Sequence, residues 1–262
     1  MSQPFITRKL RFHFTVPGPC PYLPDRVERK LFTYLPLSEA AQVNDALTHA
    51  GFRRSQTIAY RPACATCQAC RSARIIAAEF VPGRTHRRVL ARNADLQRNL
   101  VEAEATREHY DLLQRYLKAR HPDGGMSDMG WADLVAMIED TTVRTHLIEY
   151  RRPPSDDGPG DLVACVLVDV LGDGLSMVYS FYDPTLSDRS LGTFIILDHI
   201  NQARSAGFPY VYLGYWVRGS VKMDYKARFQ PLELLGGDGW VPFEQLAEAP
   251  TEADPPPTLF LA

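Results

Sequence analysis

Five consecutive residues, Arg189-Ser190-Leu191-Gly192-Thr193, have the types and spacing of a phosphate-binding turn. They open a stretch, Leu191 to Ala206, whose apolar residues recur at helical spacing until Gly207. A helix N-terminus exposes unpaired backbone N–H groups and the positive end of the helix dipole. Gly192 would let the backbone approach a phosphate closely, although a glycine near a helix start is also compatible with ordinary packing.

The elements around this turn predict a strand, turn, helix and strand in succession. Residues 175–182 mix β-branched and aromatic side chains and stop at Asp183-Pro184, and residues 210–216 resume an extended pattern. Upstream, residues 147–150 and 162–170 are predicted to be further antiparallel strands. Gly172-Asp173-Gly174 would close the last pair as a hairpin.

The rest of the chain is predicted to form two domains and a tail. Residues 5–105 would be a smaller α+β domain, with a strand over 5–16, a helix over 37–50 and a strand over 71–80. Residues 106–248 would be the second domain, beginning with helices over 104–119 and 128–140 around the turn His121 to Gly125. Residues 249–262, with three consecutive prolines, are expected to be disordered.

Charge divides the chain more sharply than its net value of −2 suggests. Residues 1–120 hold 20 Lys and Arg against 10 Asp and Glu, a balance of +10, whereas residues 121–262 hold 9 against 21, a balance of −12. The basic half includes Arg92, Arg98 and three further arginines on a predicted helix, Arg84, Arg87 and Arg88. Arg84, Arg88 and Arg92 would share one helical face and form a ridge of cations. This ridge would neutralise phosphates of a polyanion regardless of base sequence, and the alternatives are domain docking and a solvated helix face.

Four of the five cysteines are clustered in the first domain. Cys64, Cys67 and Cys70 are spaced to surround one metal, and Cys20 would supply a fourth thiolate. Zinc or an iron-sulfur cluster would fit this donor set, and reduced thiols that pack the small domain are the alternative. Cys165 lies in an apolar strand and is predicted to be core. Five cysteines are too few for a disulfide scaffold in 262 residues.

Several sequence blocks resemble a known enzyme family. The turn at residues 189–193 is similar to the pyrophosphate loop of the Gcn5-related N-acyltransferase superfamily. The chain from about residue 5 to 245 resembles the aminoacyl-tRNA-protein transferases of the N-degron pathway, and most closely the compact bacterial aspartate/glutamate leucyltransferases. The blocks that carry this resemblance are 20–24, 51–55, 60–62, 80–84, 123–126, 182–184, 190–192, 214–216 and 222–226.

The resemblance implies an α+β fold with an acyltransferase-like second domain and a basic, cysteine-containing first domain. It also implies transfer of an aminoacyl group from Leu-tRNA to the α-amine of proteins with N-terminal Asp or Glu, which marks them for degradation. The ester is already activated, and an α-amine with a pKa of about 7.7 to 8.0 is partly neutral at pH 7. Positioning and oxyanion stabilisation would then suffice, with aminoacyl-tRNA as cosubstrate and no cofactor required for the chemistry.

The same resemblance, together with residue chemistry, assigns roles to particular side chains. Lys222 and Lys226 are four residues apart and would share a face if residues 221–229 were helical, with a solvated face as the alternative. The acceptor's carboxylate needs a fixed cation. The expected catalytic residues are Asp183, Lys222, Tyr225 and Lys226; the donor and tRNA would be bound by Arg84, Arg87, Arg88, Arg189, Gly192 and Tyr215; the candidates for the acceptor carboxylate are Arg53, Arg54 and Arg61.

Other functions remain open at this point. Met177, Phe181, Phe194 and Trp216 make the neighbourhood apolar and favour a leucyl donor, while Asp183 and Asp224 would suit an arginyl donor. A coenzyme A-dependent N-acyltransferase and a non-catalytic RNA-binding or metal-sensing module are further alternatives. With no long apolar run near the N-terminus, the chain is expected to be cytoplasmic, without a membrane or DNA partner.

Overall fold

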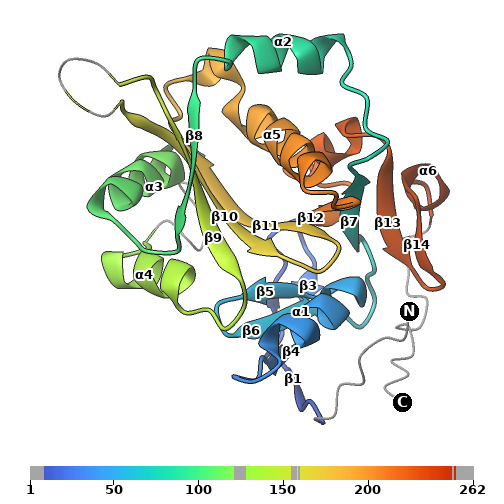
Figure 1. Cartoon of the computed structure of the whole chain (residues 1–262). Helices are drawn as coiled ribbons and strands as arrows, with labels where there is room; N and C mark the ends of the chain where they lie inside the picture. The colour runs from blue at the N-terminus through green and yellow to red at the C-terminus, as the bar shows by residue number, and fades with distance from the viewer. Residues whose placement is uncertain (1–8, 121–127, 155–157, 159, 250, 252–262) are drawn as a thin grey trace.

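The protein is described by a computed structural model that covers residues 9–120, 128–154, 158, 160–249 and 251 (Figure 1). Outside these residues lie the first part, residues 5–8, of the strand predicted over 5–16, the block at 123–126 and most of the tail at 249–262. A four-stranded sheet has the order β1 (Phe12–Phe14), β4 (Lys30–Tyr34), β6 (Ile58–Pro62) and β5 (Arg53–Ser55). A two-stranded sheet pairs β2 (Gly18–Pro19) with β3 (Val27–Glu28).

An eight-stranded mixed sheet forms the centre of the molecule. Its strand order is β14 (Gly239–Pro242), β13 (Leu232–Gly236), β7 (Cys70–Ile76), β12 (Tyr210–Val217), β11 (Gly174–Tyr182), β10 (Leu162–Val170), β9 (Thr145–Arg151) and β8 (Gln97–Glu102). Strands β7 and β8 precede residue 105 and still belong to this sheet. The domain boundary predicted near residue 105 therefore falls within one sheet.

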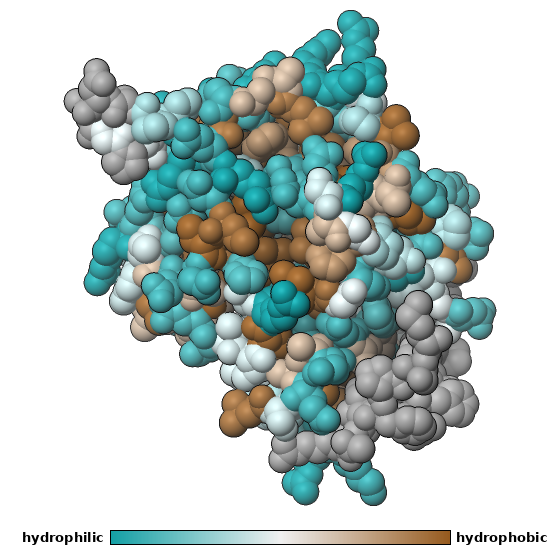
Figure 2. Space-filling view, viewed as in Figure 1, coloured by the Kyte–Doolittle hydropathy of each residue, from teal (hydrophilic) through white to brown (hydrophobic). Residues whose placement is uncertain are grey.

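Helices cover both faces of the large sheet (Figure 1). On one face, α5 (Leu191–Ser205) and α2 (Arg84–Arg92) cover a core that includes Ile75, Val166 and Ile195. On the other, α3 (Arg107–Arg120) and α4 (Trp131–Glu139) pack around Leu113 and Phe181. Figure 2 shows apolar side chains gathered near the middle of the face in view, with hydrophilic side chains around them.

The small sheet has a core of its own beneath α1 (Ala40–His49), centred on Val43, Leu47 and Phe52. The chain also forms the 3-10 turns η1 (Ser187–Arg189) and η2 (Asp224–Arg228), and the short helix α6 (Phe243–Leu246). No helix in the described part of the chain is long and apolar enough to cross a membrane.

The predicted strand, helix and strand around the phosphate-binding turn are confirmed as β11, α5 and β12. Strands β10 and β11 pair antiparallel, as predicted, and β11 and β12 pair parallel. The predicted α+β fold class is thus confirmed. The predicted helix over 221–229 is wrong, because only the 3-10 turn η2 forms there and it begins after Lys222. Lys222 and Lys226 therefore do not share a helical face.

Candidate active site

Strands β11 and β12 separate soon after they begin to pair. Their parallel register runs only from Gly174 opposite Tyr210 to Ser176 opposite Tyr212. Beyond that point the guanidinium of Arg53, from β5, lies between the two strands. It donates hydrogen bonds to the carbonyl oxygens of Met177 (3.1 Å) and Val178 (2.8 Å) in β11 and of Leu213 (3.2 Å) in β12. Arg53 thus replaces the backbone hydrogen bonds that the diverging strands no longer make.

Gly214 leaves room for the Arg53 side chain. Its φ of +72° lies in the left-handed region, and a Cβ placed on it would lie 1.1 Å from Nη1 of Arg53. The register between β12 and β7 also shifts between Tyr212 and Gly214. A residue with a side chain would therefore face both backbone strain and a direct clash.

Lys226 and Tyr215 are buried near Arg53. Lys226 is 3% exposed, and its Nζ donates a hydrogen bond to the carbonyl oxygen of Tyr215. Burial, and next the cation of Arg53, hold the pKa of Lys226 well below its usual range. The hydroxyl of Tyr215 donates to the carbonyl oxygens of Gly51 and Tyr60, at 3.0 Å each. Both side chains are therefore fixed in the interior, whereas Lys222 is exposed.

Tyrosines line the end of β11 beside α3. The rings of Tyr116 and Tyr182 meet edge to face with centroids 5.0 Å apart. Burial raises the pKa of Tyr116, and so, to a smaller degree, do Tyr182, Tyr179 and Tyr225. Burial also raises the pKa of Tyr179 to about 12. Tyr225 as a residue is 42% exposed, while burial raises the pKa of its hydroxyl.

Asp183 lies directly after β11 with its carboxylate held in one orientation. Oδ1 accepts hydrogen bonds from the backbone N–H of Thr185 at 2.9 Å and from its hydroxyl at 2.6 Å. Oδ2 lies 3.9 Å from Nη2 of Arg115, whose side chain is 49% exposed. Arg120, at the end of the same helix α3, donates a hydrogen bond to the Tyr182 hydroxyl at 2.8 Å.

Sequence reasoning did not single out Arg115 and Arg120. Both are exposed residues of a helix that was predicted over 104–119, and exposed arginines on a helix are usually solvated. Arg115 is 68 positions from Asp183 and Arg120 is 62 positions from Tyr182, so no local pattern links these contacts. The one feature that points to them is that both are exposed residues of a helix that packs on β11.

The predicted phosphate-binding turn has a different set of contacts. Arg189 makes a bidentate ion pair with Asp95, at 2.8 and 2.9 Å, and this pairing raises the pKa of Arg189. Ser190 has a φ of +53°, and the space above Gly192 is filled by the Tyr182 hydroxyl, 3.2 Å from an added Cβ. The turn thus opens helix α5 as predicted, with its arginine held by a carboxylate and its glycine packed against a tyrosine.

The arginines of α2 form an exposed basic surface, as their spacing predicted. Arg84, Arg87, Arg88 and Arg92 are exposed, and Val89 is the buried residue of the helix. Nη1 of Arg87 donates to the carbonyl oxygen of Pro82 at 2.7 Å, which leaves further N–H groups on its guanidinium. Arg98 lies outside this surface in contact with Asp198, at 3.2 Å.

Arg54 and Arg61 are held by contacts within the protein. Arg54 forms a buried bidentate ion pair with Asp169, at 2.6 and 2.7 Å, and the Thr145 hydroxyl donates to the same carboxylate at 2.7 Å. The guanidinium of Arg61 lies 5.1 Å from the centre of the Phe52 ring, and burial lowers its pKa. Arg54 therefore anchors β5 to β10, and its contacts favour a structural role over substrate binding.

The four clustered cysteines lie near one another at the start of β7. Burial and, to smaller degrees, the neighbouring Cys20, Cys64 and Cys67 together raise the pKa of the Cys70 thiol to about 12. Nevertheless, the described residues include no group of three or more His, Cys, Asp or Glu side chains arranged to hold a metal ion. The geometry gives no support to a zinc or iron-sulfur site. Cys165 is fully buried, as predicted.

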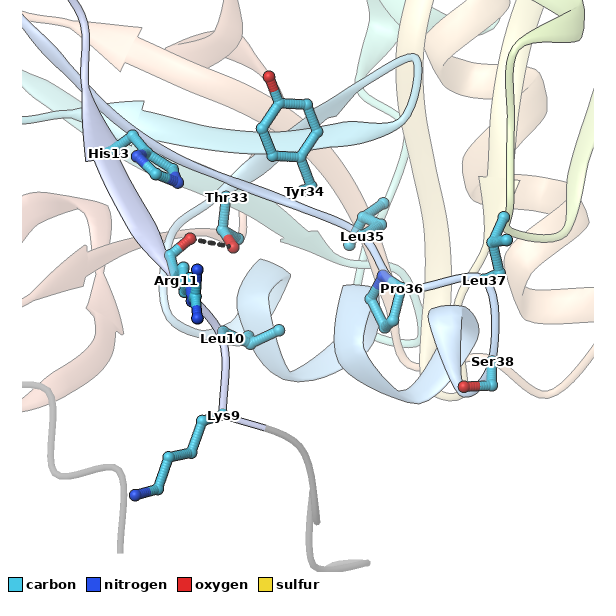
Figure 3. Close-up of a pocket in the computed structure, with 10 residues that line it drawn as sticks. All are labelled: Lys9, Leu10, Arg11, His13, Thr33, Tyr34, Leu35, Pro36, Leu37 and Ser38. Atoms are coloured by element: carbon cyan, nitrogen blue, oxygen red, sulfur yellow. Dashed lines mark hydrogen bonds between the residues drawn. The ribbon is translucent and has the colours of Figure 1, made fainter.

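A hollow of about 510 Å³ lies beside β1 and the segment that leads into α1 (Figure 3). Its lining includes Arg11, His13 and Tyr34, and the Thr33 hydroxyl donates to the Arg11 carbonyl oxygen at 2.8 Å. None of the residues that line it was predicted to act on a substrate. The candidate active site is instead the group formed by Asp183, the arginines Arg115 and Arg120 of α3, and the neighbouring tyrosines Tyr116, Tyr179, Tyr182 and Tyr225.

The predicted leucine-binding residues do not line an open pocket. Phe181 is completely buried, and Met177, Phe194 and Trp216 are at most 9% exposed. All four belong to the two cores of the large sheet. The apolar character of this segment therefore reflects packing, and it carries no information about the donor.

Comparison with known proteins identifies the family. Residues 18–88 match the family model of the arginine-tRNA-protein transferase N terminus, and residues 108–236 match that of its C terminus. Proteins named aspartate/glutamate leucyltransferase are similar to this chain. They include those of Phenylobacterium zucineum, 68% identical over 92% of this chain and 93% of that protein, and of Caulobacter vibrioides, 67% identical over 92% and 86%.

A third such relative, from Nitrobacter hamburgensis, is 56% identical over 93% of this chain and 96% of its own length. Among solved structures, the C-terminal domain of a putative lysylphosphatidylglycerol synthetase from Agrobacterium fabrum has a TM-score of 0.42 and 19% identity, over 63% of this chain and 53% of that one. Two matching family models and relatives of this identity, each aligned over most of both chains, place the chain in the arginine-tRNA-protein transferase family.

Proposed function

We propose that this chain transfers leucine from Leu-tRNA to the α-amino group of proteins that begin with Asp or Glu, and so marks them for degradation. The observation that carries this proposal is the 68% identity, over 92% of the chain, to a protein named aspartate/glutamate leucyltransferase. The choice of leucine depends on this relationship alone. We also propose that the reaction takes place in the cytoplasm.

The chemistry requires two substrates to be held together. The neutral α-amine attacks the ester carbonyl of the aminoacyl-tRNA, an amide bond forms, and the ester oxygen leaves with the ribose and takes up the proton that the amine loses. Asp183 supports this step because Thr185 holds its Oδ1, which leaves Oδ2 for the amine. It would accept a hydrogen bond from the attacking amine and so orient it.

Tyr225, a residue that is 42% exposed, is the candidate donor to the oxyanion through its hydroxyl. Lys226 supports the reaction indirectly, because the hydrogen bond from its buried amine to the Tyr215 carbonyl oxygen fixes the backbone of β12. Arg189 and Gly192 would act in the same way, by fixing the start of α5 beside Tyr182. The cysteines have no part in these steps.

The tRNA would lie along α2, where Arg84, Arg87 and Arg88 are exposed. Cations on such a surface neutralise backbone phosphates and give affinity without reading bases. An arginyl donor would use the same surface and the same chemistry, so the donor is a matter for experiment.

The test is a transfer assay with Leu-tRNA or Arg-tRNA and peptides that begin with Asp, Glu or Ala. We expect transfer from Leu-tRNA to the Asp and Glu peptides and not to the Ala peptide. Transfer from Arg-tRNA alone would reverse the donor, and transfer from acetyl coenzyme A alone would favour a coenzyme A-dependent enzyme. RNA binding without turnover would favour a binding module.

A variant makes the assay specific to the site. Asp183→Asn removes the carboxylate but keeps the shape, and it should lower kcat by about 100-fold or more. Asp161→Asn is the matched control, since the Asp161 side chain is 82% exposed and lies 3.9 Å from Arg152, outside the site. Equal activity of Asp183→Asn and the wild type would remove Asp183 from the mechanism.

A further inference from the structure

The acceptor residue carries two charged groups that must both be held close to the reacting ester. In an N-terminal aspartate, the α-nitrogen and the side-chain carboxylate are separated by only two carbons, so they lie about 3 to 4 Å apart. A site that binds both needs an acceptor for the amine and a cation for the carboxylate at a similar separation. Both partners must also be accessible to a substrate.

Among the described residues, Asp183 and Arg115 meet these requirements. Oδ2 of Asp183 and Nη2 of Arg115 are 3.9 Å apart, which is too long for a direct hydrogen bond and matches the spacing of the two groups of the substrate. Oδ1 is occupied by Thr185, so Oδ2 is the oxygen available to an amine. The Arg115 side chain is 49% exposed.

Arg120 provides a second cation on the same side. It uses one N–H of its guanidinium on the Tyr182 hydroxyl, and an arginine carries five such donors. By contrast, Arg53 donates to three backbone carbonyls, Arg54 pairs with Asp169, and Arg61 lies over the ring of Phe52. The arginines first expected to bind the acceptor are thus held elsewhere, whereas Arg115 and Arg120 of α3 lie beside Asp183 and Tyr182.

We propose that Arg115, assisted by Arg120, binds the side-chain carboxylate of the acceptor's N-terminal Asp or Glu while Asp183 Oδ2 holds the α-amine. This inference rests on the proposed function and adds the residues that select the acceptor. Glutamate is longer than aspartate by one methylene, about 1.5 Å. A half-exposed arginine with a long, flexible stem adjusts by that distance, which explains how one site takes both residues but not Ala.

The experiment compares acceptor peptides that differ only in the first residue, Asp or Asn, which are nearly identical in shape. Arg115→Gln should lower kcat/KM for the Asp peptide by about 10- to 100-fold, because a charge-assisted hydrogen bond is worth about 1.5 to 3 kcal/mol. The value for the Asn peptide should change less than about threefold. Using the ratio of the two peptides within each variant cancels any effect on folding or on tRNA binding.

Lys118→Gln is the matched control, because Lys118 is an exposed cation of the same helix without a described contact to Asp183 or Tyr182. Charge reversal supplies a gain: Arg115→Glu should raise kcat/KM for a peptide that begins with Lys above the wild-type value. An unchanged ratio of Asp to Asn activity in both Arg115 variants would overturn the proposal.

Binding measured without tRNA separates this proposal from the proposed function. Calorimetry with the Asp peptide alone should show tighter binding to the wild type than to Arg115→Gln. Loss of this difference, with transfer intact in the wild type, would refute the acceptor site and leave the transferase. Binding that depends on Arg115 without transfer from any aminoacyl-tRNA would refute the transferase and leave the site.

Discussion

Replacement of Gly214 by alanine tests whether Arg53 lies between β11 and β12. The added methyl carbon would lie 1.1 Å from Nη1 of Arg53, so the guanidinium must leave the gap or the strands must move. If it leaves, the carbonyl oxygens of Met177, Val178 and Leu213 lose their charged donor. We expect a loss of about 3 to 5 kcal/mol for the donor and about 1 to 2 kcal/mol for the strained φ of +72°.

The magnitude that identifies Arg53 is a coupling free energy. Arg53→Ala alone should cost about 3 to 5 kcal/mol of the free energy of unfolding, measured with urea. In that background Gly214→Ala has no side chain to displace, so it should cost only the backbone term of about 1 to 2 kcal/mol. The two substitutions would therefore be less than additive by about 3 to 5 kcal/mol, the donor contribution that each removes on its own.

Gly239→Ala is a control for the backbone term, since Gly239 also has a positive φ, of +117°, and no atom within 4 Å of an added Cβ. It should show the same cost in both Arg53 backgrounds. Equal costs of Gly214→Ala with and without Arg53 would refute the placement of the guanidinium in the gap.

Three further predictions concern charge. Asp169→Asn leaves the buried guanidinium of Arg54 unpaired, so the free energy of unfolding measured with urea should fall by about 3 to 5 kcal/mol. A decrease below about 1 kcal/mol would contradict the buried pair. Burial lowers the pKa of Lys226 below 10.5 in the folded protein, so between the folded pKa and 10.5 the unfolded chain binds one more proton. The free energy of unfolding should therefore fall as pH decreases through that window, by up to about 1.4 kcal/mol per pH unit. Lys226→Met should remove this slope. Replacing Arg84 and Arg88 together by Gln should weaken tRNA binding and reduce its salt slope by about 1 to 2, while Arg204→Gln, an exposed change at the end of α5, should leave both unchanged.

Local patterns predicted the elements that carry the site, and distant contacts decided the rest. The apolar periodicity of residues 191–206 and the glycine at 207 defined α5 to within one residue. The exposed arginines of α2 also followed from their spacing. In contrast, Arg189 has the same sequence context whether it binds a phosphate or Asp95, and only tertiary structure brings Asp95 to it from 94 positions away.

Distant contacts also explain why the predicted helix over residues 221–229 is wrong. A helix through Lys222 and Lys226 would have placed both on one face. Instead, Lys226 is buried against the carbonyl oxygen of Tyr215, and the chain forms only the 3-10 turn η2 there. Arg115 could not be identified from the sequence because its partner lies 68 positions away, beyond α4 and the three strands β9, β10 and β11. The roles of these residues in transfer stay predictions, as does a division of the chain near residue 105.

Strand β7 has a consequence for the order in which the chain folds. It is made early, yet its two neighbours in the sheet are β12 and β13, and Arg74 meets Tyr212 and Glu233 across 138 and 159 positions. On the ribosome, β7 must wait with both edges unpaired until nearly all of the chain has been synthesised. Contacts of such sequence separation slow folding and leave strand edges open to aggregation. A nascent chain that stops before residue 236 would therefore lack a completed sheet and would be a natural target for chaperones and proteases.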